Sequence, residues 1–559
     1  MAHTKACGPQ VSDANPELSM KEYTKEEFFK VMKTAVQEPE APALLAMPDS
    51  LVDPAVVEAL VAKAQPSIRD RHEEDIGPDE GKLVRFTLSN GVRVAYRRNS
   101  ARPQEFRVRV SAVGGRALET REQHGHAVAG AALWINGGAG EHPAEVVSRF
   151  ASMHQLSYDC SCGAETLSFD LLVHTTVDQA IERAMSVLWL YLAHPLMDSR
   201  ALDRFKTRIQ RSEQSLPKSV ERTTTLELVR CLFTEESQWR LAELPYHVAE
   251  KIEIDQVKSL LARQLVPSNL EVAISGDFDP AELEAGLVRY CGILGVDDDA
   301  RASAAPAWHG REDEVFRLHY GAGSRVGSAA HITDDTERAY VLMAFPTVNR
   351  WGRLVASAPG GVELDLVGGK SLKLVPSTIS AGEGGSYCAD MHVSRCMSVA
   401  NDIISNRLFE EVREKRGLVY SIGFSWRPYR LLSGGYCSIS FLPKMDQVAQ
   451  SVAQVKAVLR DLLDNGFSED EFQGSKGPLV TKVRETEKQN VFWVQLMEDL
   501  GNDASPKSVD CIRQVADHYD TLTKEMVLEV MRATMSHCTD NLSIATGSAG
   551  PEAPETPLL

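Results

Sequence analysis

The ten cysteines of this chain are the first residues whose chemistry has to be considered. No two of them have the C-x-x-C spacing of a zinc ribbon or a redox motif. Cys160 and Cys162 are the nearest pair, and on a strand their i, i+2 spacing would place both side chains on one face. The pattern favours reduced, mostly buried thiols in a reducing compartment over a metal site or disulfides.

A glycine-rich segment, NGGAG at positions 136–140, has the composition of a phosphate-binding loop. It lacks the Lys-Ser/Thr ending of such a loop and follows a predicted helix instead of a strand, which argues against a nucleotide site. We expect these glycines to end the helix and turn the chain, because glycine adopts left-handed backbone conformations that other residues resist.

The charge balance restricts the partners of the chain. Sixty Lys and Arg against 78 Asp and Glu give a formal net charge of −18, which discourages binding to nucleic acid and to anionic membranes. A cationic peptide would fit this charge, although simple solubility also explains it. No apolar run approaches the roughly 20 residues that span a bilayer. The N-terminus resembles neither a secretion signal nor a transit peptide, so we expect no targeting signal in this chain.

The elements that position the functional residues form two series. Around Asn90-Gly91, apolar and polar residues alternate on both sides of a strong hairpin signal. Helices are then expected near 124–136, from Pro143, and over about 177–193, 198–214 and 219–233, with strands at 167–174 and 270–278. A second series has strands at 338–348, 417–426 and 434–442, a long helix over about 396–415, and helices after Met445 and Ser468.

These patterns predict an α+β fold of two related units, each a largely antiparallel sheet covered by helices. The expected division is a linker-like N-terminal extension over 1–82, a first domain over 83–295, an interdomain linker over 296–314, a second domain over 315–548 and a disordered tail over 549–559. Helices on one face leave the other face of the sheet to be hidden by something else.

Four segments carry a resemblance to a known family: LSNGVRVAYRR, VGGRALE, NLEVAISGDFDPAEL and NRLFEEVREKRGLVYSIGFS. From about Leu83 to Ala549 the chain resembles the pitrilysin/insulinase family of inverted-motif zinc metallopeptidases, the inverzincins. Three further segments, SLPKSVERTTTLELV, PTVNRWG and VRETEKQN, resemble the C-terminal half of a chloroplast member of that family. The resemblance implies a LuxS/metallohydrolase-like fold and the plastid stroma as location, or otherwise the cytosol.

The family's chemistry requires H-x-x-E-H on a helix, in which two His bind zinc and the Glu activates water. At the matching place this chain has His126, Ala129 and Gly130, so only the first ligand remains. A replacement metal site could draw on four residues: His124, His126, His142 and Glu213. Without the water-activating Glu we expect no catalytic residue, no zinc and no other cofactor in this chain. Zinc is expected only in a catalytic partner half.

The family's substrate-binding pair is better preserved. The resemblance assigns Arg413 and Tyr420 to hydrogen bonds with the backbone of the substrate, and the V-R-E-K-R-G-L-V-Y spacing is intact. Arg offers a fork of donors to a carbonyl, and a phenol can donate to an oxyanion. In the alternative interpretation, Arg413 is a solvated cation at the end of a helix and Tyr420 is a core residue of a strand. Active relatives also let substrate add as an extra strand to a sheet edge, and some of that surface should remain.

The hypothesis is a non-catalytic, substrate-binding half or subunit that assists the processing or degradation of transit or other peptides. Its expected partners are a catalytic half bearing H-x-x-E-H and a peptide substrate, with no nucleic acid and no membrane. One alternative is a scaffold or assembly protein of the same fold. The other is an active zinc metalloendopeptidase with unusual ligands, which the residues at 129 and 130 oppose.

Overall fold

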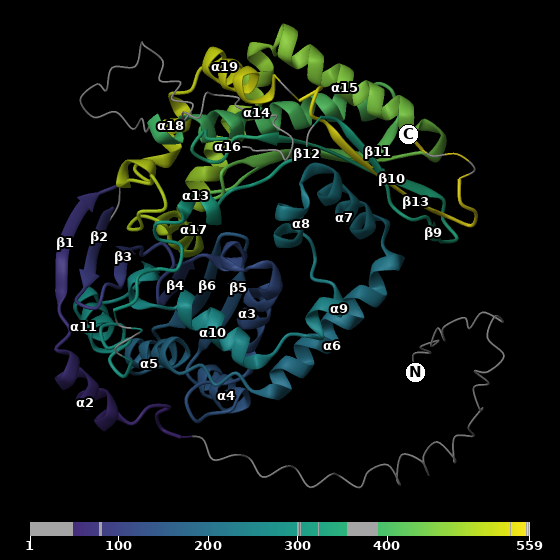
Figure 1. The fold of residues 1–559 in the computed structure, drawn as a ribbon. Coiled ribbons are helices and arrows are strands. Elements are labelled where there is room, and N and C mark those ends of the chain that lie inside the picture. The colour runs from purple at the N-terminus through teal and green to yellow at the C-terminus, as the bar shows by residue number, and fades with distance from the viewer. Residues whose placement is uncertain are drawn as a thin grey trace, which may run out of the picture. The chain divides into compact units, whose positions relative to one another are not determined.

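The computed structural model describes residues 48–77, 81–298, 301, 303–321, 323–354, 389–536, 538–554, 556 and 558–559. All elements discussed below lie within Asp49–Leu559, which forms one compact unit. We call residues 49–295 the first half and residues 315–559 the second half. Each half contributes one sheet with helices packed on it (Figure 1). The predicted α+β architecture is confirmed.

The first sheet has seven strands in the order β1-β2-β3-β7-β4-β6-β5. Its strands are β1 (Ile68–Asp75), β2 (Lys82–Leu88), β3 (Arg93–Arg98), β4 (Glu105–Val113), β5 (Leu156–Cys162), β6 (Thr166–His174) and β7 (Leu270–Gly276). Neighbouring strands are antiparallel except β3 and β7, which are parallel. The predicted hairpin is present, because β2 pairs with β3 and Gly91 turns the chain with a φ of 93°.

The first sheet has one apolar face and one polar face, because its strands alternate. Val110 and its cross-strand partner Phe169 lie on the apolar face. The ring of Phe169 contacts Trp134 and Tyr191, which come from two helices of the first half. The helices of the first half are α3 (His126–Asn136), α4 (Ala144–Met153), α5 (Ala180–Ala193), α6 (Ser199–Ser215), α7 (Val220–Leu232), α8 (Glu235–Leu241), α9 (Tyr246–Ala249), α10 (Ile254–Gln264) and α11 (Pro280–Tyr290).

The second sheet has the order β11-β12-β10-β13-β8, and β9 pairs with β13. Its strands are β8 (Arg325–Ser328), β9 (Ile332–Thr333), β10 (Arg338–Thr347), β11 (Val419–Pro428), β12 (Gly435–Pro443) and β13 (Ser543–Gly550). One face packs on α14, α15 and α19, as the shared core cluster shows. The helices of the second half are α13 (Glu312–Val315), α14 (His392–Leu408), α15 (Val448–Asn465), α16 (Glu469–Thr486), α17 (Asn490–Met497), α18 (Val515–Asp520) and α19 (Lys524–Met535).

Each half supplies a helix that covers part of the remaining face of the other half's sheet. Helix α7 of the first half packs on β10 and β13, and its Leu228 and Leu232 belong to the core cluster of the second sheet. Helix α17 of the second half packs on β4 and β7, and its Trp493 and Met497 share a cluster with Ala273. The two halves therefore complete one another's cores, which explains how the open sheet faces are hidden.

Two expected boundaries fall inside elements of the structure. Residues 54–75, placed in the extension, form α2 (Pro54–Ala64) and the edge strand β1, which pairs with β2. At the other end β13 continues to Gly550, and Ala549 is fully buried, so the sheet outlasts the expected start of the tail. Residues 1–47 of the extension lie outside the described residues. Among the helices that the structure does describe, none is long and apolar enough to cross a membrane.

Candidate functional site

The degenerate motif lies at the N-terminus of α3, which begins at His126. Gly125 precedes the helix with a φ of 84°, a left-handed conformation that favours glycine. The buried carboxylate of Glu119 accepts hydrogen bonds from the backbone N–H groups of Gly125 (3.2 Å) and Ala127 (2.6 Å). Burial raises the pKa of Glu119, while Arg116 at 3.9 Å opposes this effect. Sequence reasoning missed Glu119, although an acid just before a helix is a known capping signal.

Helix α10 covers the face of α3 on which metal ligands would have to stand. The ring Nε2 of His126 lies 2.9 Å from Oε1 of Gln256 on α10. A Cβ at Gly130 would lie 3.5 Å from Leu261 Cδ1 and 3.6 Å from Val257 Cγ1, and Ala129 is completely buried. Position 130, where the second zinc ligand is lost, packs against α10, and position 129, where the water-activating Glu is lost, is buried. The residues present do not fit a zinc site of the family's kind.

The four residues of the conceivable replacement site do not meet, because each has a separate partner. His124 packs edge-on against Trp239, with 5.4 Å between ring centroids. His142 Nε2 lies 2.9 Å from the carbonyl oxygen of Leu51, and Glu213 accepts a hydrogen bond from the backbone N–H of Tyr246 at 3.1 Å. Over the part of the chain that the structure describes, no three His, Cys, Asp or Glu side chains are placed to hold a metal ion.

Arg413 lies in a π-helical segment, Phe409–Glu414, that follows α14. Its guanidinium stacks over the ring of Phe409 at 4.6 Å from the centroid. The next two cations are neutralised by carboxylates: Lys415 by Glu410 and Glu411, and Arg416 by Glu411. No carboxylate of the described residues lies within ion-pair distance of Arg413. Arg413 is thus an exposed cation held in place by an aromatic ring, with its donors available.

Tyr420 lies at a β-bulge near the start of β11. The register between β11 and β12 shifts between Val419 and Ile422, so β11 carries an extra residue there. A bulge turns a side chain away from the regular alternation of a strand. Tyr420 is 81% exposed, more than any other large hydrophobic side chain among the described residues. Both members of the predicted pair therefore stand at backbone irregularities, a π-helical turn and a bulge, which often occur at functional sites.

The edge strand β5 lies beside the degenerate motif, because α3 packs on it. Among the described strands it pairs only with β6, so its outer backbone edge has no strand partner. Burial raises the pKa of the Cys160 and Cys162 thiols on this strand, which keeps both protonated at neutral pH. The edge can therefore offer backbone hydrogen bonds to an extended segment, but it offers no reactive thiolate.

Residues 251–479 match the family model described as the peptidase M16 inactive domain. Residues 251–479 therefore resemble the M16 inactive domain, and they make up less than half of the chain. Over 520 residues it is also 26% identical to the chloroplastic stromal processing peptidase of Pisum sativum, a match that covers 89% of this chain and 40% of the relative. The chain thus spans less than half the length of the stromal processing peptidases it matches, including those of Oryza sativa and Arabidopsis thaliana.

Solved structures show the same M16 fold. The peptidase M16 inactive domain from Pseudomonas fluorescens is 18% identical with a TM-score of 0.65, covering 85% of this chain and all of that one. The periplasmic protease PqqL from Escherichia coli is 14% identical with a TM-score of 0.67, covering 95% and 51%. The ferredoxin protease FusC, in complex with Arabidopsis ferredoxin, is 14% identical with a TM-score of 0.62, covering 95% and 51%. The resemblance to the pitrilysin/insulinase family is confirmed.

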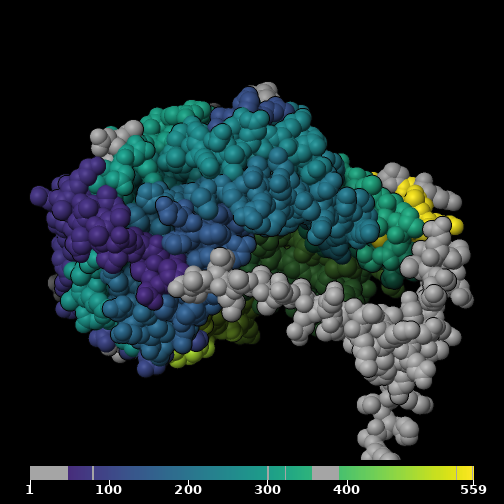
Figure 2. All heavy atoms as spheres, turned by 90° about the horizontal axis from the view of Figure 1, so that it is seen from below, coloured from purple at the N-terminus to yellow at the C-terminus, as the bar shows by residue number. Residues whose placement is uncertain are grey.

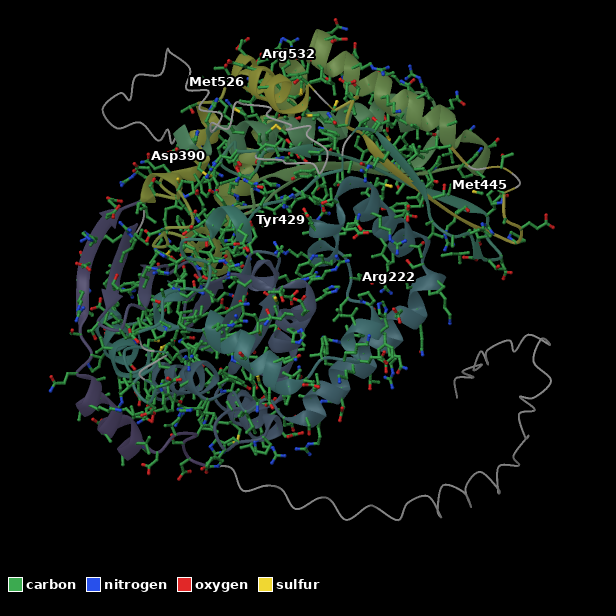
Figure 3. The ribbon with its side chains drawn as sticks, in the orientation of Figure 1. Arg222, Asp390, Tyr429, Met445, Met526 and Arg532 are labelled. Atoms are coloured by element: carbon green, nitrogen blue, oxygen red, sulfur yellow. The ribbon has the colours of Figure 1, made fainter. Side chains whose placement is uncertain are left out.

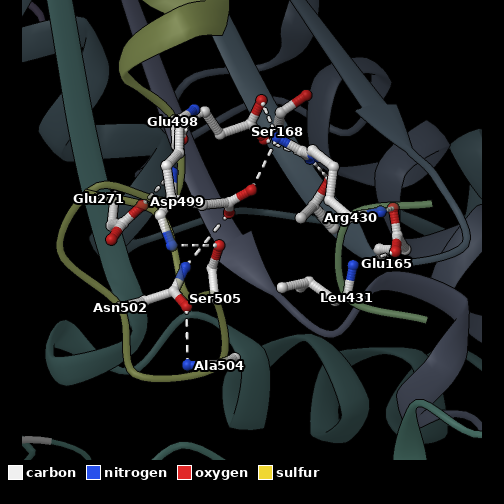
Figure 4. A network of polar contacts seen from close by, with 12 residues as sticks. Glu165, Ser168, Glu271, Arg430, Leu431, Glu498, Asp499, Asn502, Ala504 and Ser505 are labelled. Carbon is white, nitrogen blue, oxygen red and sulfur yellow. Dashed lines mark hydrogen bonds and ion pairs between the residues drawn. The ribbon is translucent and has the colours of Figure 1, made fainter. Parts of the chain in front are cut away.

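A buried ionic network joins the two halves of the chain (Figure 4). Arg430, in the turn between β11 and β12, forms ion pairs with Glu498 (2.8 Å) and Asp499 (2.9 Å) in the loop after α17. Glu271 on β7 accepts hydrogen bonds from the backbone N–H groups of Asp499 (2.8 Å) and Gly501 (3.0 Å). Sequence reasoning missed this network, because its members lie far apart along the chain. It fixes the β11–β12 hairpin, and therefore Tyr420, relative to the first sheet.

Proposed function

We propose that this chain is the non-catalytic, substrate-binding half or subunit of an M16-type peptidase. It would work beside a catalytic half that carries H-x-x-E-H, in the processing or degradation of transit or other peptides. The match to an M16 inactive domain, with Ala129 and Gly130 packed against α10, supports the non-catalytic part of this proposal. The similarity to stromal processing peptidases supports the chloroplast stroma as its location.

The observation that carries the proposal is the exposure of Tyr420. Burying a large apolar side chain contributes about 1.5–3 kcal/mol, so a folded chain gains nothing by leaving a tyrosine ring in water. Tyr420 is nevertheless 81% exposed, next to a bulge that directs it away from the core. Arg413 adds a cation without a carboxylate partner in the same connection between α14 and β11. A guanidinium and a phenol on this connection suit the carbonyl groups of an unfolded polypeptide.

Two further features support a polypeptide as the substrate. The outer edge of β5 is unpaired among the described strands, and such an edge binds an extended chain through main-chain hydrogen bonds. The FusC structure, which shares this fold, was determined in complex with a protein. Both features fit recognition of backbone groups, which tolerates many sequences, as a processing enzyme requires.

The test is binding of a fluorescein-labelled, unstructured 20-residue peptide to the isolated chain, measured by fluorescence anisotropy. The Arg413→Gln/Tyr420→Phe variant should bind about tenfold or more weakly, because each lost hydrogen bond is worth about 0.5–1.5 kcal/mol. Arg460→Gln is the matched control, since Arg460 is an exposed arginine on α15. Thermal melts of both variants should match the parent, because neither change removes a buried group.

Binding that is equal in the parent and the double variant would refute the proposed role of the pair. Absence of any peptide binding would favour the scaffold alternative. Chelator-sensitive cleavage of the peptide by the isolated chain would contradict the non-catalytic assignment.

A further inference from the structure

On the face that α7 packs against, the described residues leave one strip of the second sheet uncovered. Cross-strand pairs place opposite residues on the same face, and the pairs of this strip are Gly423 with Ser440, Ser425 with Ser438, and Arg427 with Tyr436. We call these six residues the shelf. Their neighbours on the opposite face, Phe424, Cys437 and Ile439, are buried in the core.

Helix α7 covers the continuation of this face but not the shelf. The next strand continues the rows, with Leu342 beside Ser440 and Ala344 beside Ser438, and both of these β10 residues are buried. On β13, a Cβ at Gly547 would overlap the Thr224 side chain of α7. At Gly423, by contrast, a Cβ would meet nothing nearer than Ser440 Oγ at 4.0 Å. The cover by α7, which packs on β10 and β13, therefore ends between β10 and β12.

The shelf carries hydroxyl groups and one cation, but no carboxylate. Ser425, Ser438 and Ser440 are half-buried. The Ser440 hydroxyl is hydrogen-bonded to the Tyr340 side chain, and the hydroxyls of Ser425 and Ser438 can donate or accept a hydrogen bond. Arg427 is exposed, and no carboxylate of the described residues lies within ion-pair distance of it. In a chain of net charge −18, an exposed arginine that forms no ion pair with a described carboxylate places a positive charge on this surface.

The end of the shelf at Tyr436 is rigid and adjoins the first half. The ring of Tyr436 contacts Phe233, which follows α7, at 6.0 Å and Tyr429 at 6.5 Å between centroids. Tyr429, labelled in Figure 3, lies where the elements of the two halves meet. Figure 2 shows teal residues of the first half next to green residues of the second on one face of the molecule. Fixed aromatic and arginine side chains are the types that dominate binding energy at interfaces.

We propose that the shelf binds an extended polypeptide segment through its backbone and anchors a carboxylate of that segment on Arg427. The inference rests on the proposed function and names the substrate class that the same strand selects. Tyr420 and Arg427 lie seven positions apart on β11, which corresponds to about 23 Å. A peptide that reaches both therefore needs an acidic residue roughly seven positions from the part that contacts Tyr420. Overall charge favours basic peptides, whereas this surface favours an acidic residue at one position.

The experiment compares two fluorescein-labelled 14-residue peptides of Gly, Ser and Ala with one tyrosine, which differ only in one Asp or Asn eight positions from the label. The parent chain should bind the Asp peptide about twofold to fivefold more tightly than the Asn peptide, the upper part of the range for an exposed ion pair. Arg427→Gln should abolish that difference and leave binding of the Asn peptide unchanged. Arg427→Glu should reverse the preference.

A second variant tests the shelf sterically. Gly423→Leu places a side chain over the open strip, and the backbone there is ordinary strand, so the fold should tolerate it. This substitution should weaken the binding of both peptides by about tenfold or more. Gly474→Leu is the matched control, because Gly474 lies on the exposed face of α16 with nothing within 4 Å of a new Cβ. Binding in this control should equal the parent.

The outcomes separate the inference from the proposed function. If Arg413→Gln/Tyr420→Phe weakens both peptides but Arg427→Gln and Gly423→Leu change neither, the shelf inference is wrong and the proposed function stands. If the double variant also binds like the parent, or the parent binds neither peptide, both are wrong. A preference for Asn over Asp in the parent would also overturn the carboxylate anchor.

Discussion

Glu165 in the first half accepts a hydrogen bond from the backbone N–H of Leu432 in the second half at 2.7 Å, although the residues lie 267 positions apart. The same carboxylate also accepts from the N–H groups of Arg430 and Leu431. Glu165 is buried in the turn between β5 and β6, and the three N–H groups belong to the turn between β11 and β12. One carboxylate therefore fixes β11 and β12, the strands of the shelf, to β5, the edge strand beside the degenerate motif.

Removal of that carboxylate should destabilise the whole described unit. Glu165→Ala leaves Arg430 without part of its negative surroundings and three buried N–H groups without an acceptor, so we expect a loss of about 3–5 kcal/mol. Glu165→Gln keeps one acceptor oxygen and should cost about 1–2 kcal/mol. Urea unfolding measures both values. Glu485→Ala, at an exposed ion pair with Lys488, is the control and should change stability by less than about 1 kcal/mol. If Glu165→Ala lowers the free energy of unfolding no more than this control does, the Glu165 carboxylate does not hold the two turns together.

Stability should fall as pH falls from about 6.5 to 4, partly through His124. Burial lowers the pKa of His124 to about 4, and the nearby positive charge of Arg116 acts in the same direction. The unfolded chain binds this proton near pH 6.5, so stability is fully present above that pH and is lost on acidification. His124→Phe keeps an aromatic ring against Trp239. Between these pH values, the free energy of unfolding of the variant should fall by about 1–2 kcal/mol less than that of the parent. This difference is modest because His124 is only half-buried.

Urea unfolding at half-unit pH steps measures this effect. His309→Gln, at an exposed histidine, is the control and should follow the parent. An identical pH profile for parent and His124→Phe would exclude His124 as a source of the acid sensitivity.

Restoring the missing ligand should harm the fold instead of rebuilding the metal site. Gly130→His must fit an imidazole against Leu261 and Val257 of α10, and overpacking of this kind costs about 1–3 kcal/mol. Gly130→Ala is the matched control, because a methyl group there makes only ordinary contacts. It should stabilise the chain by about 0.5–1 kcal/mol through its helix propensity. Thermal melts decide, and a Gly130→His variant as stable as Gly130→Ala would show that α10 does not close this face.

The purified chain should hold no stoichiometric zinc after dialysis. Two of the positions that ligate or activate in the family motif are Ala129 and Gly130, and His126 alone gives little affinity. Metal analysis by mass spectrometry should find well below one zinc per chain. The Ala129→Glu/Gly130→His variant should not gain metal, because α10 covers that face of α3. About one tightly held zinc in the parent would revive the hypothesis of unusual ligands.

Local sequence patterns predicted the elements well. The helix expected over 219–233 is α7 (Val220–Leu232), and the strand expected over 434–442 is β12 (Gly435–Pro443). Periodicity and turn signals are local properties, so they survive in a single sequence. The long helix expected to end near Lys415 was less regular, because its last residues form the π-helical segment that carries Arg413. The exposure of Tyr420 also depends on a bulge, which no local pattern announced.

What the sequence by itself determined is the set of elements, the loss of the water-activating Glu at 129 and of the second zinc ligand at 130, and the preserved spacing from Arg413 to Tyr420. What only the tertiary structure decided is which faces are covered. The arginines of β4 alternate with apolar residues as on a solvent-facing strand, yet Arg109 is 15% exposed and lies 3.6 Å from Glu498. Burial of that face depends on a segment nearly four hundred positions away. Strand periodicity records which side is polar, but not which distant element packs on it.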